Sequence, residues 1–387
     1  MESLGTLAGS GLMMLAVIAT AGVIARRSHF YRQGLAAPGN RELSLDGLRG
    51  LAALMVAMHH AAIGRVWLAD NEWGDARSLV LQLAGPAAVV LFFMLTGYLF
   101  WSKARKGNGR VKPWKLWRGR LCRIAPLYLF SLLLVLLVAV GETGGNWLTA
   151  DHWKSLLRLL ALGALKWQNV GPVNLNVYNA GVVWTLWYEW SFYLALPFMA
   201  WLSTGRKIFG FALVAYVAAA AGLCFHVNLQ PGLFFLLGML CPVLLENSAA
   251  RSRLQTPHAA AAALLAGLLL LALGRNFLLT TLPTASLAGA CFPVFVAAAA
   301  GNNYFGVLDC PAMRCLGAIS FSLYLLHGIV FTMLFHGLRL AGLSSLPPTE
   351  YWLLITVAAC AMTGLCSVTY RWIEFPFLFA SHKARSG

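Results

Sequence analysis

The chain alternates between long apolar stretches and short polar links. A membrane-spanning helix needs about 20 consecutive, mostly apolar residues, and eleven stretches of that kind are present. They lie at residues 4–25, 44–63, 79–101, 123–141, 181–202, 208–225, 230–246, 257–274, 281–300, 315–338 and 352–373. The pattern therefore predicts an all-α fold, a polytopic membrane helix bundle of about eleven transmembrane helices.

One further apolar segment, from Lys154 to Leu165, is too short to cross a membrane and is flanked by charge. We predict an interfacial or re-entrant helix there. The link that contains it is polar and aromatic, with Trp147, Trp153, Trp167, Asn174, Asn176 and Tyr178. Such a loop suits a sugar-like acceptor, and it equally suits the aromatic belt found at membrane surfaces.

Composition supports a membrane protein. Hydrophobic residues make up 59% of the chain and charged residues only 11%, with a mean hydropathy of +0.71, whereas soluble domains carry about 25% charge. The net charge of +16 resides in links between spans, so we do not expect nucleic acid as a partner. The eight cysteines form no CxxC pair and no Cys/His ligand pattern, so we expect neither a disulfide framework nor a metal site.

The basic links predict the orientation, because cytoplasmic loops are enriched in Lys and Arg. Alternate links carry the basic residues, among them Arg26, Arg27, Arg32, Arg41, Lys103, Arg105, Lys106, Arg110, Lys112, Lys115, Arg118, Arg120, Arg206, Lys207, Arg251, Arg253, Arg314, Lys383 and Arg385. We predict an extracytoplasmic N-terminus and a cytoplasmic C-terminus. The first span has its arginines after it and reads as a retained helix, not as a cleaved signal peptide.

The second span carries an unusual set of polar residues. Asp46 and Arg49 lie in its first turns and His59 and His60 near its end. Eleven residues separate Arg49 from His60, close to three helical turns, so the two share a face and lie about 16 Å apart. Asp46 falls near that face, whereas His59 is rotated by roughly 80°. Such residues at membrane depth indicate a functional site, although capping, interfacial anchoring and a buried core histidine also fit the pattern.

Other spans add polar groups. Arg120 and Arg123 run into the fourth span and suit phosphate recognition or simple anchoring. Glu189 lies in the first turns of the span over 181–202, on the predicted outer side. His327 lies mid-span after Ser320, Ser322 and Tyr324, which also suit helix-to-helix hydrogen bonds. Arg371 and Glu374 close the last span, where we predict a structural ion pair. The chain contains no P-loop, dinucleotide fingerprint or GxSxG elbow.

Six stretches, in order, resemble the motifs of the acyltransferase-3 family of integral membrane acyltransferases. They are Leu45-Asp46-Gly47-Leu48-Arg49-Gly50 with His60, the run from Val90 to Leu99, the run from Arg120 to Tyr128, the run from Trp184 to Pro197, the run from Ile319 to His327, and the run from Tyr370 to Pro376. Thr96 and Tyr98 replace the serine and phenylalanine that are usual in the second motif. The resemblance covers residues 41 to 376.

The resemblance implies an O-acyltransferase that moves an acyl group, most often acetyl, from cytoplasmic acyl-CoA to a hydroxyl of a carbohydrate or glycolipid beyond the membrane. Acyl-CoA is then a co-substrate, and no permanently bound cofactor is expected. The implied partners are the bilayer, the acceptor and envelope-biosynthesis proteins. On this basis we assign catalysis to His60, Glu189 and Asp46, and donor binding to Arg49, Arg120 and Arg123. Acceptor or cavity roles fall to Tyr193, Ser320, Tyr324 and His327.

The expected division of the chain is residues 1–40 as an extra N-terminal span and basic link, residues 41–376 as the membrane domain, and residues 377–387 as a cytoplasmic tail. The extra span departs from the usual family pattern. We also expect no fused extracytoplasmic esterase-like domain of the kind that some members carry. The imidazole of His60 can act as a general base or form a covalent acyl-histidine, and the sequence leaves both open.

Two hypotheses of other classes compete with the acyltransferase. One is a secondary transporter of acyl groups or small solutes in which His60 and Glu189 form a proton relay. Inverted repeats would favour it, and none is visible in the sequence. The other is a noncatalytic membrane partner in polysaccharide or glycolipid biosynthesis, against which the intact Arg49 and His60 argue.

Overall fold

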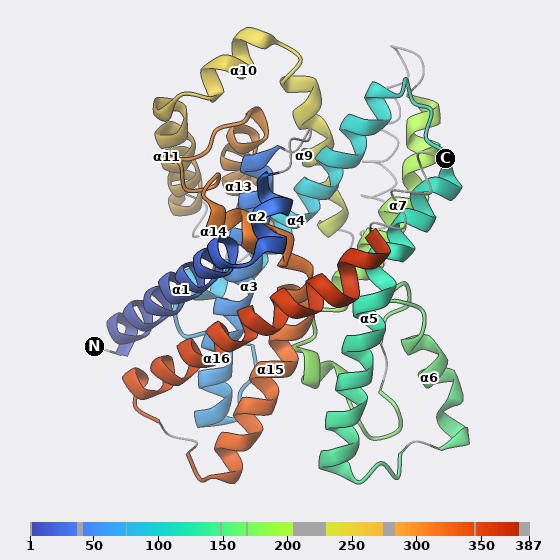
Figure 1. Ribbon diagram of the computed structural model, residues 1–387, viewed down its shortest axis with the longest axis vertical. Helices are drawn as coiled ribbons and strands as arrows, with labels where there is room; N and C mark the ends of the chain where they lie inside the picture. The colour runs from blue at the N-terminus through green and yellow to red at the C-terminus, as the bar shows by residue number, and fades with distance from the viewer. Residues whose placement is uncertain are drawn as a thin grey trace.

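The apolar stretches form helices in the computed structural model of the protein (Figure 1). The structure describes residues 2–36, 42–74, 76–147, 149–167, 169–203, 230–273, 283–343 and 346–378. Across these ranges the regular structure is helical, apart from an isolated β-bridge between Val170 and Val173. The predicted all-α membrane bundle is therefore confirmed as a fold class.

The elements follow one another along the chain with the bounds listed here. They are α1 (Glu2–Arg27), α2 (His29–Ala36), α3 (Leu43–Asp70), α4 (Leu79–Lys106), α5 (Pro113–Thr143), η1 (Ala150–His152), α6 (Trp153–Leu159), η2 (Leu175–Asn179), α7 (Trp184–Leu202), α9 (Gln230–Leu244), α10 (Ser248–Leu254), α11 (Pro257–Leu273), α13 (Pro283–Ala300), α14 (Pro311–Ala318), α15 (Ser320–Leu340), α16 (Pro348–Thr369) and the π-helical η3 (Tyr370–Glu374).

Six helices among the described residues are long and apolar enough to cross a membrane. They are Gly5–Arg27, Leu43–Asp70, Leu79–Lys106, Pro113–Thr143, Ser320–Leu340 and Pro348–Leu378, and each overlaps a predicted span. A seventh span arises if Pro231–Leu244 and Ser248–Leu254 count as one, although they meet at 114°. The predicted spans over 257–274, 281–300 and 181–202 are shorter helices, α11, α13 and α7. The predicted span over 208–225 lies outside the described residues.

Three predicted boundaries differ from the structure. The span over 315–338 is broken at Ile319 into α14 and α15. Helix α5 begins at Pro113 and not at residue 123, because proline at the first helical position is pre-organised for a helix. The short helix predicted from Lys154 to Leu165 is helical only over Trp153–Leu159. It ends before Leu162 and Gly163, which both have positive φ.

Glycine allows the closest contacts between helices. Gly97 of α4 lies against the backbone of Phe235 in α9, and Gly238 of α9 lies against Met94, so a Cβ at either glycine would clash with the opposite backbone. Helix α3 meets α14 in the same way, where Gly50 lies against the backbone of Met313 and Gly317. Helices in lipid associate through packing of this kind, since there is little hydrophobic driving force between them.

The link between α5 and α7 is folded back on the bundle. Trp147 and Trp167 are buried, and the Trp167 indole donates a hydrogen bond of 2.7 Å to the hydroxyl of Tyr128. Of the three tryptophans in this link, only Trp153 is exposed. Most of this aromatic surface is therefore committed to packing, and two of its tryptophans are not available for stacking on a sugar.

The close packing of α4 on α9 predicts a stability difference between two glycine-to-alanine variants. Gly97→Ala should lower the thermal unfolding temperature of the purified protein in detergent, because its Cβ meets backbone and overpacking costs about 1–3 kcal/mol. Gly141→Ala, in α5, is the matched control, since nothing lies within 4 Å of its added Cβ. Equal unfolding temperatures for the two variants would contradict this account of the interface.

Candidate active site

Helix α3 positions three of the candidate residues, Asp46, Arg49 and His60. It runs for 28 residues to Asp70 and is capped by Asn71, which has a left-handed conformation and whose N–H donates a hydrogen bond to the Trp67 carbonyl. Near its start, Gly47 and Gly50 allow close contact with the segment from Leu308 to Gly317. The polar first turns of α3 are thus held against α14 by backbone contact.

Asp46 and Arg49 form an ion pair along one side of α3. Their side chains approach to 3.3 Å (Arg49 Nη1 to Asp46 Oδ1), and both are 28% exposed. An ion pair in a long apolar helix is costly unless water or polar groups reach it. Its partial exposure indicates a polar interior face, as the sequence predicts for this side of the helix.

Arg120 on α5 and Glu189 on α7 lie beside that pair. The Arg120 guanidinium lies 4.8 Å from the centre of the Phe100 ring and 5.6 Å from that of Tyr193. The Tyr193 hydroxyl donates a hydrogen bond of 2.8 Å to Glu189 Oε2. Glu189 in turn interacts electrostatically with Arg120, Arg123 and Arg49. The prediction that Glu189 lies on the outer side, apart from these arginines, is therefore wrong, because the first turns of α7 lie beside the start of α3 and not beside its far end. We call Asp46, Arg49, Arg120, Arg123, Glu189, Tyr193 and Glu374 the arginine cluster.

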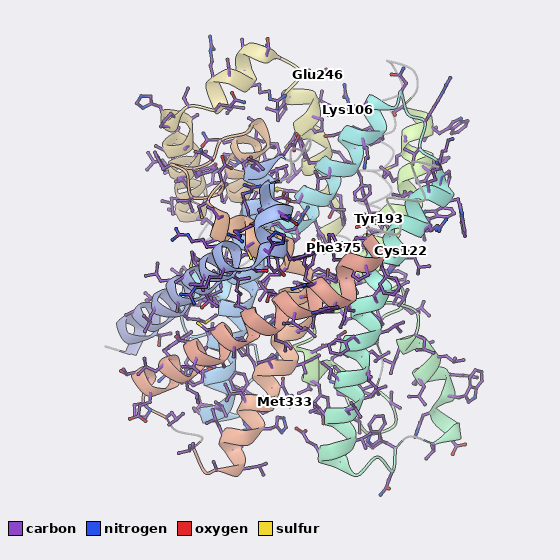
Figure 2. The ribbon with its side chains drawn as sticks, viewed as in Figure 1. Lys106, Cys122, Tyr193, Glu246, Met333 and Phe375 are labelled. Atoms are coloured by element: carbon purple, nitrogen blue, oxygen red, sulfur yellow. The ribbon has the colours of Figure 1, made fainter. Side chains whose placement is uncertain are left out.

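Arg123 completes this cluster through a buried ion pair with Glu374. Nη1 of Arg123 lies 2.6 Å from Oε2 of Glu374, and the Glu374 side chain is fully buried. Ser322 of α15 donates a hydrogen bond to the same carboxylate. Helix α5 contacts both α7 and η3, and Figure 2 labels Cys122 of α5, Tyr193 of α7 and Phe375 after η3 in this region.

The predicted ion pair between Arg371 and Glu374 is wrong. Both residues lie in the π-helical turn η3, in which residues three apart do not lie one above the other as they do in an α-helix. Glu374 points into the bundle toward Arg123, whereas the Arg371 guanidinium lies over the rings of Phe30 and Trp372.

His60 does not join the arginine cluster but pairs with His327 of α15. Nδ1 of His60 lies 3.1 Å from Nε2 of His327 and 3.0 Å from the carbonyl oxygen of Val56. Nδ1 of His327 lies 2.9 Å from the carbonyl oxygen of Leu323. The candidate residues thus form two groups, His60 with His327 at one position and the arginine cluster near the other end of the face.

The two carbonyl oxygens determine which nitrogen of each neutral ring carries the proton. A carbonyl can only accept a hydrogen bond, so Nδ1 of His327 donates to Leu323 and its Nε2 is an acceptor. Nδ1 of His60 then donates, to Val56 and to His327 Nε2. Nε2 of His60 is left with its lone pair, which is the form that a general base requires.

His59 faces a different neighbour, as the helical geometry predicts. Its Nδ1 lies 2.8 Å from the Leu81 carbonyl oxygen of α4, and its ring fills the space beside Gly85. Tyr324 and Ser320, the remaining candidates on α15, are buried. The Tyr324 hydroxyl lies 2.8 Å from that of Thr185 at the start of α7.

The surroundings of His60 include an aromatic group that sequence reasoning missed. The Trp73 ring stacks on that of His60, with 6.3 Å between ring centres. The ring centre of Trp67 lies 6.4 Å from that of Trp73 and 5.7 Å from that of His336. Trp73 is 45% exposed. It follows the C-terminal end of α3 in a polar link, and no local pattern in the sequence marks it as a neighbour of His60.

The link before α7 packs against the part of α15 that carries His327. Gly328, which follows His327, lies against the backbone of Asn179 in η2. The Tyr178 ring stacks on His336, and His336 Nδ1 lies 3.1 Å from Glu142. Burial, followed by the nearby Glu142 charge, raises the pKa of Tyr178 to about 12, so its hydroxyl stays protonated at neutral pH.

Comparison with known proteins gives one match. A family model described as an acyltransferase domain matches residues 42–371, which includes every residue of the two groups except Glu374. No curated protein and no solved structure matches the chain. Because the matched region covers most of its length, the chain belongs to the acyltransferase-3 family of membrane acyltransferases.

Proposed function

We propose that the protein is an O-acyltransferase that moves an acyl group, acetyl in the simplest case, from acyl-CoA to a hydroxyl of a carbohydrate or glycolipid. The observation that carries this proposal is the His60–His327 pair, which leaves Nε2 of His60 free to accept a proton. We further propose that the donor enters at the end of α3 that carries Arg49. The acceptor would then meet the thioester near His60.

The chemistry can be written on this atom. Nε2 of His60 removes the proton of the acceptor hydroxyl while the oxygen attacks the thioester carbonyl. The tetrahedral intermediate collapses with cleavage of the carbon–sulfur bond, and the thiolate of CoA takes the proton back from His60. The products are an ester and free CoA. In the intermediate state, the Nδ1–H of protonated His60 donates to Val56 and His327, so the pair supports the developing positive charge.

The arginine cluster supports a donor site at the other end of this face. Arginine recognises phosphate through its planar fork of N–H donors, and CoA carries phosphates. The three arginines stand beside three carboxylates, those of Asp46, Glu189 and Glu374. The phosphates would therefore compete with carboxylates for the guanidinium groups, and the side chain of Arg49 is more exposed than that of Arg123, 28% against 19%.

We assign the basic links to the cytoplasmic side of a bacterial inner membrane, with the N-terminus outside and the C-terminus inside. Trp73, His60 and Trp67 then lie toward the outside, where the acceptor is presented. An exposed aromatic face suits the C–H surface of a sugar ring, which makes carbohydrate the favoured acceptor. The transporter hypothesis needs His60 and Glu189 in one relay, yet Glu189 is not among the groups that interact with His60 in the described structure.

The first prediction concerns the general base. His60→Ala should abolish acyl transfer, because positioned base catalysis contributes about 10²–10⁴-fold. His327→Ala should lower kcat by about tenfold or more with little change in KM for acetyl-CoA, whereas His327→Gln keeps an acceptor atom and should recover part of the loss. Transfer of a labelled acetyl group by purified protein measures both parameters.

His59→Ala is the matched control, since His59 is the adjacent residue of the same type and its Nδ1 is bonded to α4, with its ring edge-on to that of His60 at 5.0 Å between ring centres. It should retain most of the activity. An inactive His59→Ala protein beside an active His60→Ala protein, both at normal membrane level, would refute the assignment of the base.

The second prediction separates donor binding from structure at Arg123. Arg123→Gln alone leaves Glu374 buried without its cation, which destabilises a protein by about 3–5 kcal/mol. The double variant Arg123→Gln/Glu374→Gln removes both charges and should recover much of the stability. If Arg123 binds the donor, acetyl-CoA affinity stays at least tenfold weaker in the double variant. Isothermal titration that finds wild-type affinity in the double variant would limit Arg123 to a structural role.

The third prediction concerns the acceptor. Trp73→Ala should raise KM for a carbohydrate acceptor by up to about tenfold, as the loss of an aromatic contact worth about 0.5–1.5 kcal/mol implies. KM for acetyl-CoA should not change. Trp153→Ala removes another exposed tryptophan, that of α6, and should leave both constants unaltered. A Trp73→Ala protein with an unchanged acceptor KM would place the acceptor elsewhere.

A further inference from the structure

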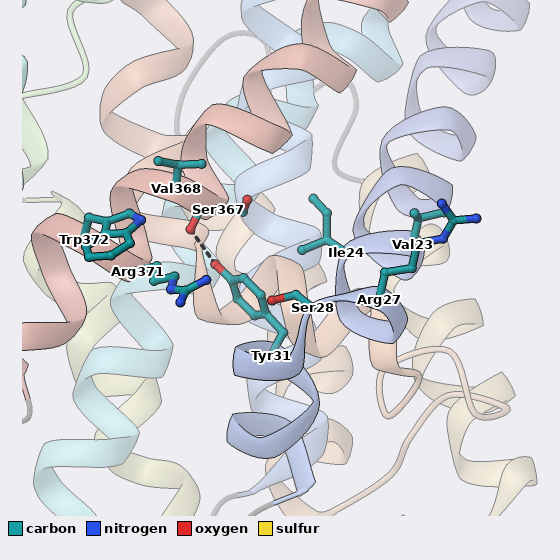
Figure 3. A pocket seen from close by; sticks show the side chains of 9 residues that line it. All are labelled: Val23, Ile24, Arg27, Ser28, Tyr31, Ser367, Val368, Arg371 and Trp372. Carbon is teal, nitrogen blue, oxygen red and sulfur yellow. Dashed lines mark hydrogen bonds between the residues drawn. The ribbon is translucent and has the colours of Figure 1, made fainter.

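A pocket lies between the two N-terminal helices and the C-terminal end of α16, and none of its lining residues belongs to the two groups of candidate catalytic residues. Its volume is about 410 Å³. Its walls come from α1, the start of α2, the last residues of α16 and η3 (Figure 3). The lining residues are Val23, Ile24, Arg27, Ser28, Tyr31, Ser367, Val368, Arg371 and Trp372.

One side of this pocket is apolar and open. Val23, Val368 and Trp372 are 51%, 53% and 68% exposed, although all three belong to or adjoin membrane-spanning helices. Apolar side chains that are exposed on such helices face lipid. The pocket therefore opens to the hydrocarbon or headgroup region of the bilayer and not to the interior of the bundle.

The other side of the pocket is cationic. Arg371 and Arg27 lie on either side of Tyr31 and Ser28 in the view of Figure 3. The Tyr31 hydroxyl donates a hydrogen bond of 2.8 Å to the Ser367 carbonyl oxygen. The Arg371 guanidinium lies 5.5 Å from the centre of the Phe30 ring and 5.2 Å from that of Trp372. Neither arginine has a carboxylate partner in the described part of the chain.

The missing anion at Arg371 has a structural cause. Glu374, three residues later, is turned inward by η3 and is committed to Arg123 and Ser322. The cation that remains is held by two aromatic rings, so less side-chain entropy is lost when it binds a ligand. An arginine that is pre-ordered and lacks an anion, next to an open apolar wall, fits an amphipathic anionic ligand.

We propose that this pocket binds an anionic membrane phospholipid, with its phosphate at Arg371, its acyl chains along Val23, Val368 and Trp372, and Arg27 as a second cation at the opposite edge of the pocket. The planar guanidinium matches two phosphate oxygens at once. A soluble phosphate compound would leave the exposed apolar wall unused, which is why the lipid is the favoured source of the phosphate.

The site depends on the segment that precedes the matched domain. Residues 23 to 31 lie before residue 42, where the family match begins, and Arg371 is its last residue. Helix α1 packs along α16 over much of its length (Figure 1), and the pocket lies where that contact ends and α2 begins. The N-terminal helices thus supply one wall of a lipid site for this chain.

The test measures lipid binding and does not depend on acyl transfer. The full-length protein in detergent is titrated with dioleoyl phosphatidylglycerol or with zwitterionic dioleoyl phosphatidylcholine, and bound lipid is counted by native mass spectrometry. The protein should retain phosphatidylglycerol selectively. Arg27→Gln/Arg371→Gln should weaken its binding by about tenfold or more, since the charge-assisted contact of Arg371 alone is worth roughly a factor of ten.

Arg26→Gln/Arg32→Gln is the matched control. It removes the same charge from exposed residues of α1 and α2 that do not line the pocket. Binding should stay near the wild-type value in this variant. An equal loss in both double variants would mean general attraction of anionic lipid to basic residues and would overturn the proposal.

A third variant tests the apolar wall while it keeps both arginines. Val23→Trp fills part of the pocket from an exposed position and should also weaken phosphatidylglycerol binding. Unchanged binding in this variant would overturn the placement of the acyl chains. Displacement of the lipid by glycerol 3-phosphate at similar concentration would show a soluble phosphate site and would overturn the choice of a lipid.

Discussion

The packing of the helices depends on pairing charged side chains inside the membrane, where an unpaired charge is costly. Arg49, Arg120 and Arg123 stand beside the carboxylates of Asp46, Glu189 and Glu374, contributed by α3, α7 and η3. A charge in the membrane interior is stable only when it is paired or reached by water. The helices that carry these residues are therefore fixed relative to one another by electrostatics as well as by packing. The glycine contacts of α3 with α14 set the position of the first pair.

The pairing of charges also keeps the ionic groups apart from the neutral histidine pair along α3. The cluster at the start of α3 is ionic, whereas the pair at His60 and His327 consists of two rings linked by one shared proton and anchored by two backbone carbonyls. A charged neighbour at His60 would change which form of the ring is stable. The distance of about three helical turns between the two groups lets one helix hold a site for anions and a site for proton transfer.

Local periodicity explains what the sequence could predict. The shared face of Asp46, Arg49 and His60, the separate direction of His59 and the helical bundle all follow from helix geometry and apolar run length. The contacts of His60 with His327 and of Arg123 with Glu374 join residues more than 250 positions apart, and no local spacing encodes them. Trp73 escaped notice because only the folded link brings it to His60. The pair of Arg371 with Glu374 was misjudged because α-helical spacing does not hold in a π-helical turn.

The π-helical turn at Tyr370–Glu374 has a consequence for how sequence changes here can be tolerated. Within five residues it sends one charged side chain to the interior and another to the lipid-facing surface. A π-helical turn holds one residue more than the α-helical turn that would replace it. Deletion of a single residue in this turn would therefore let an α-helical turn replace it with little rotation of what lies beyond, but it would bring residues three and four apart onto one face and remove the separation of the inward and outward side chains. Substitutions can alter one role at a time, but a change of length at this place would disturb both together.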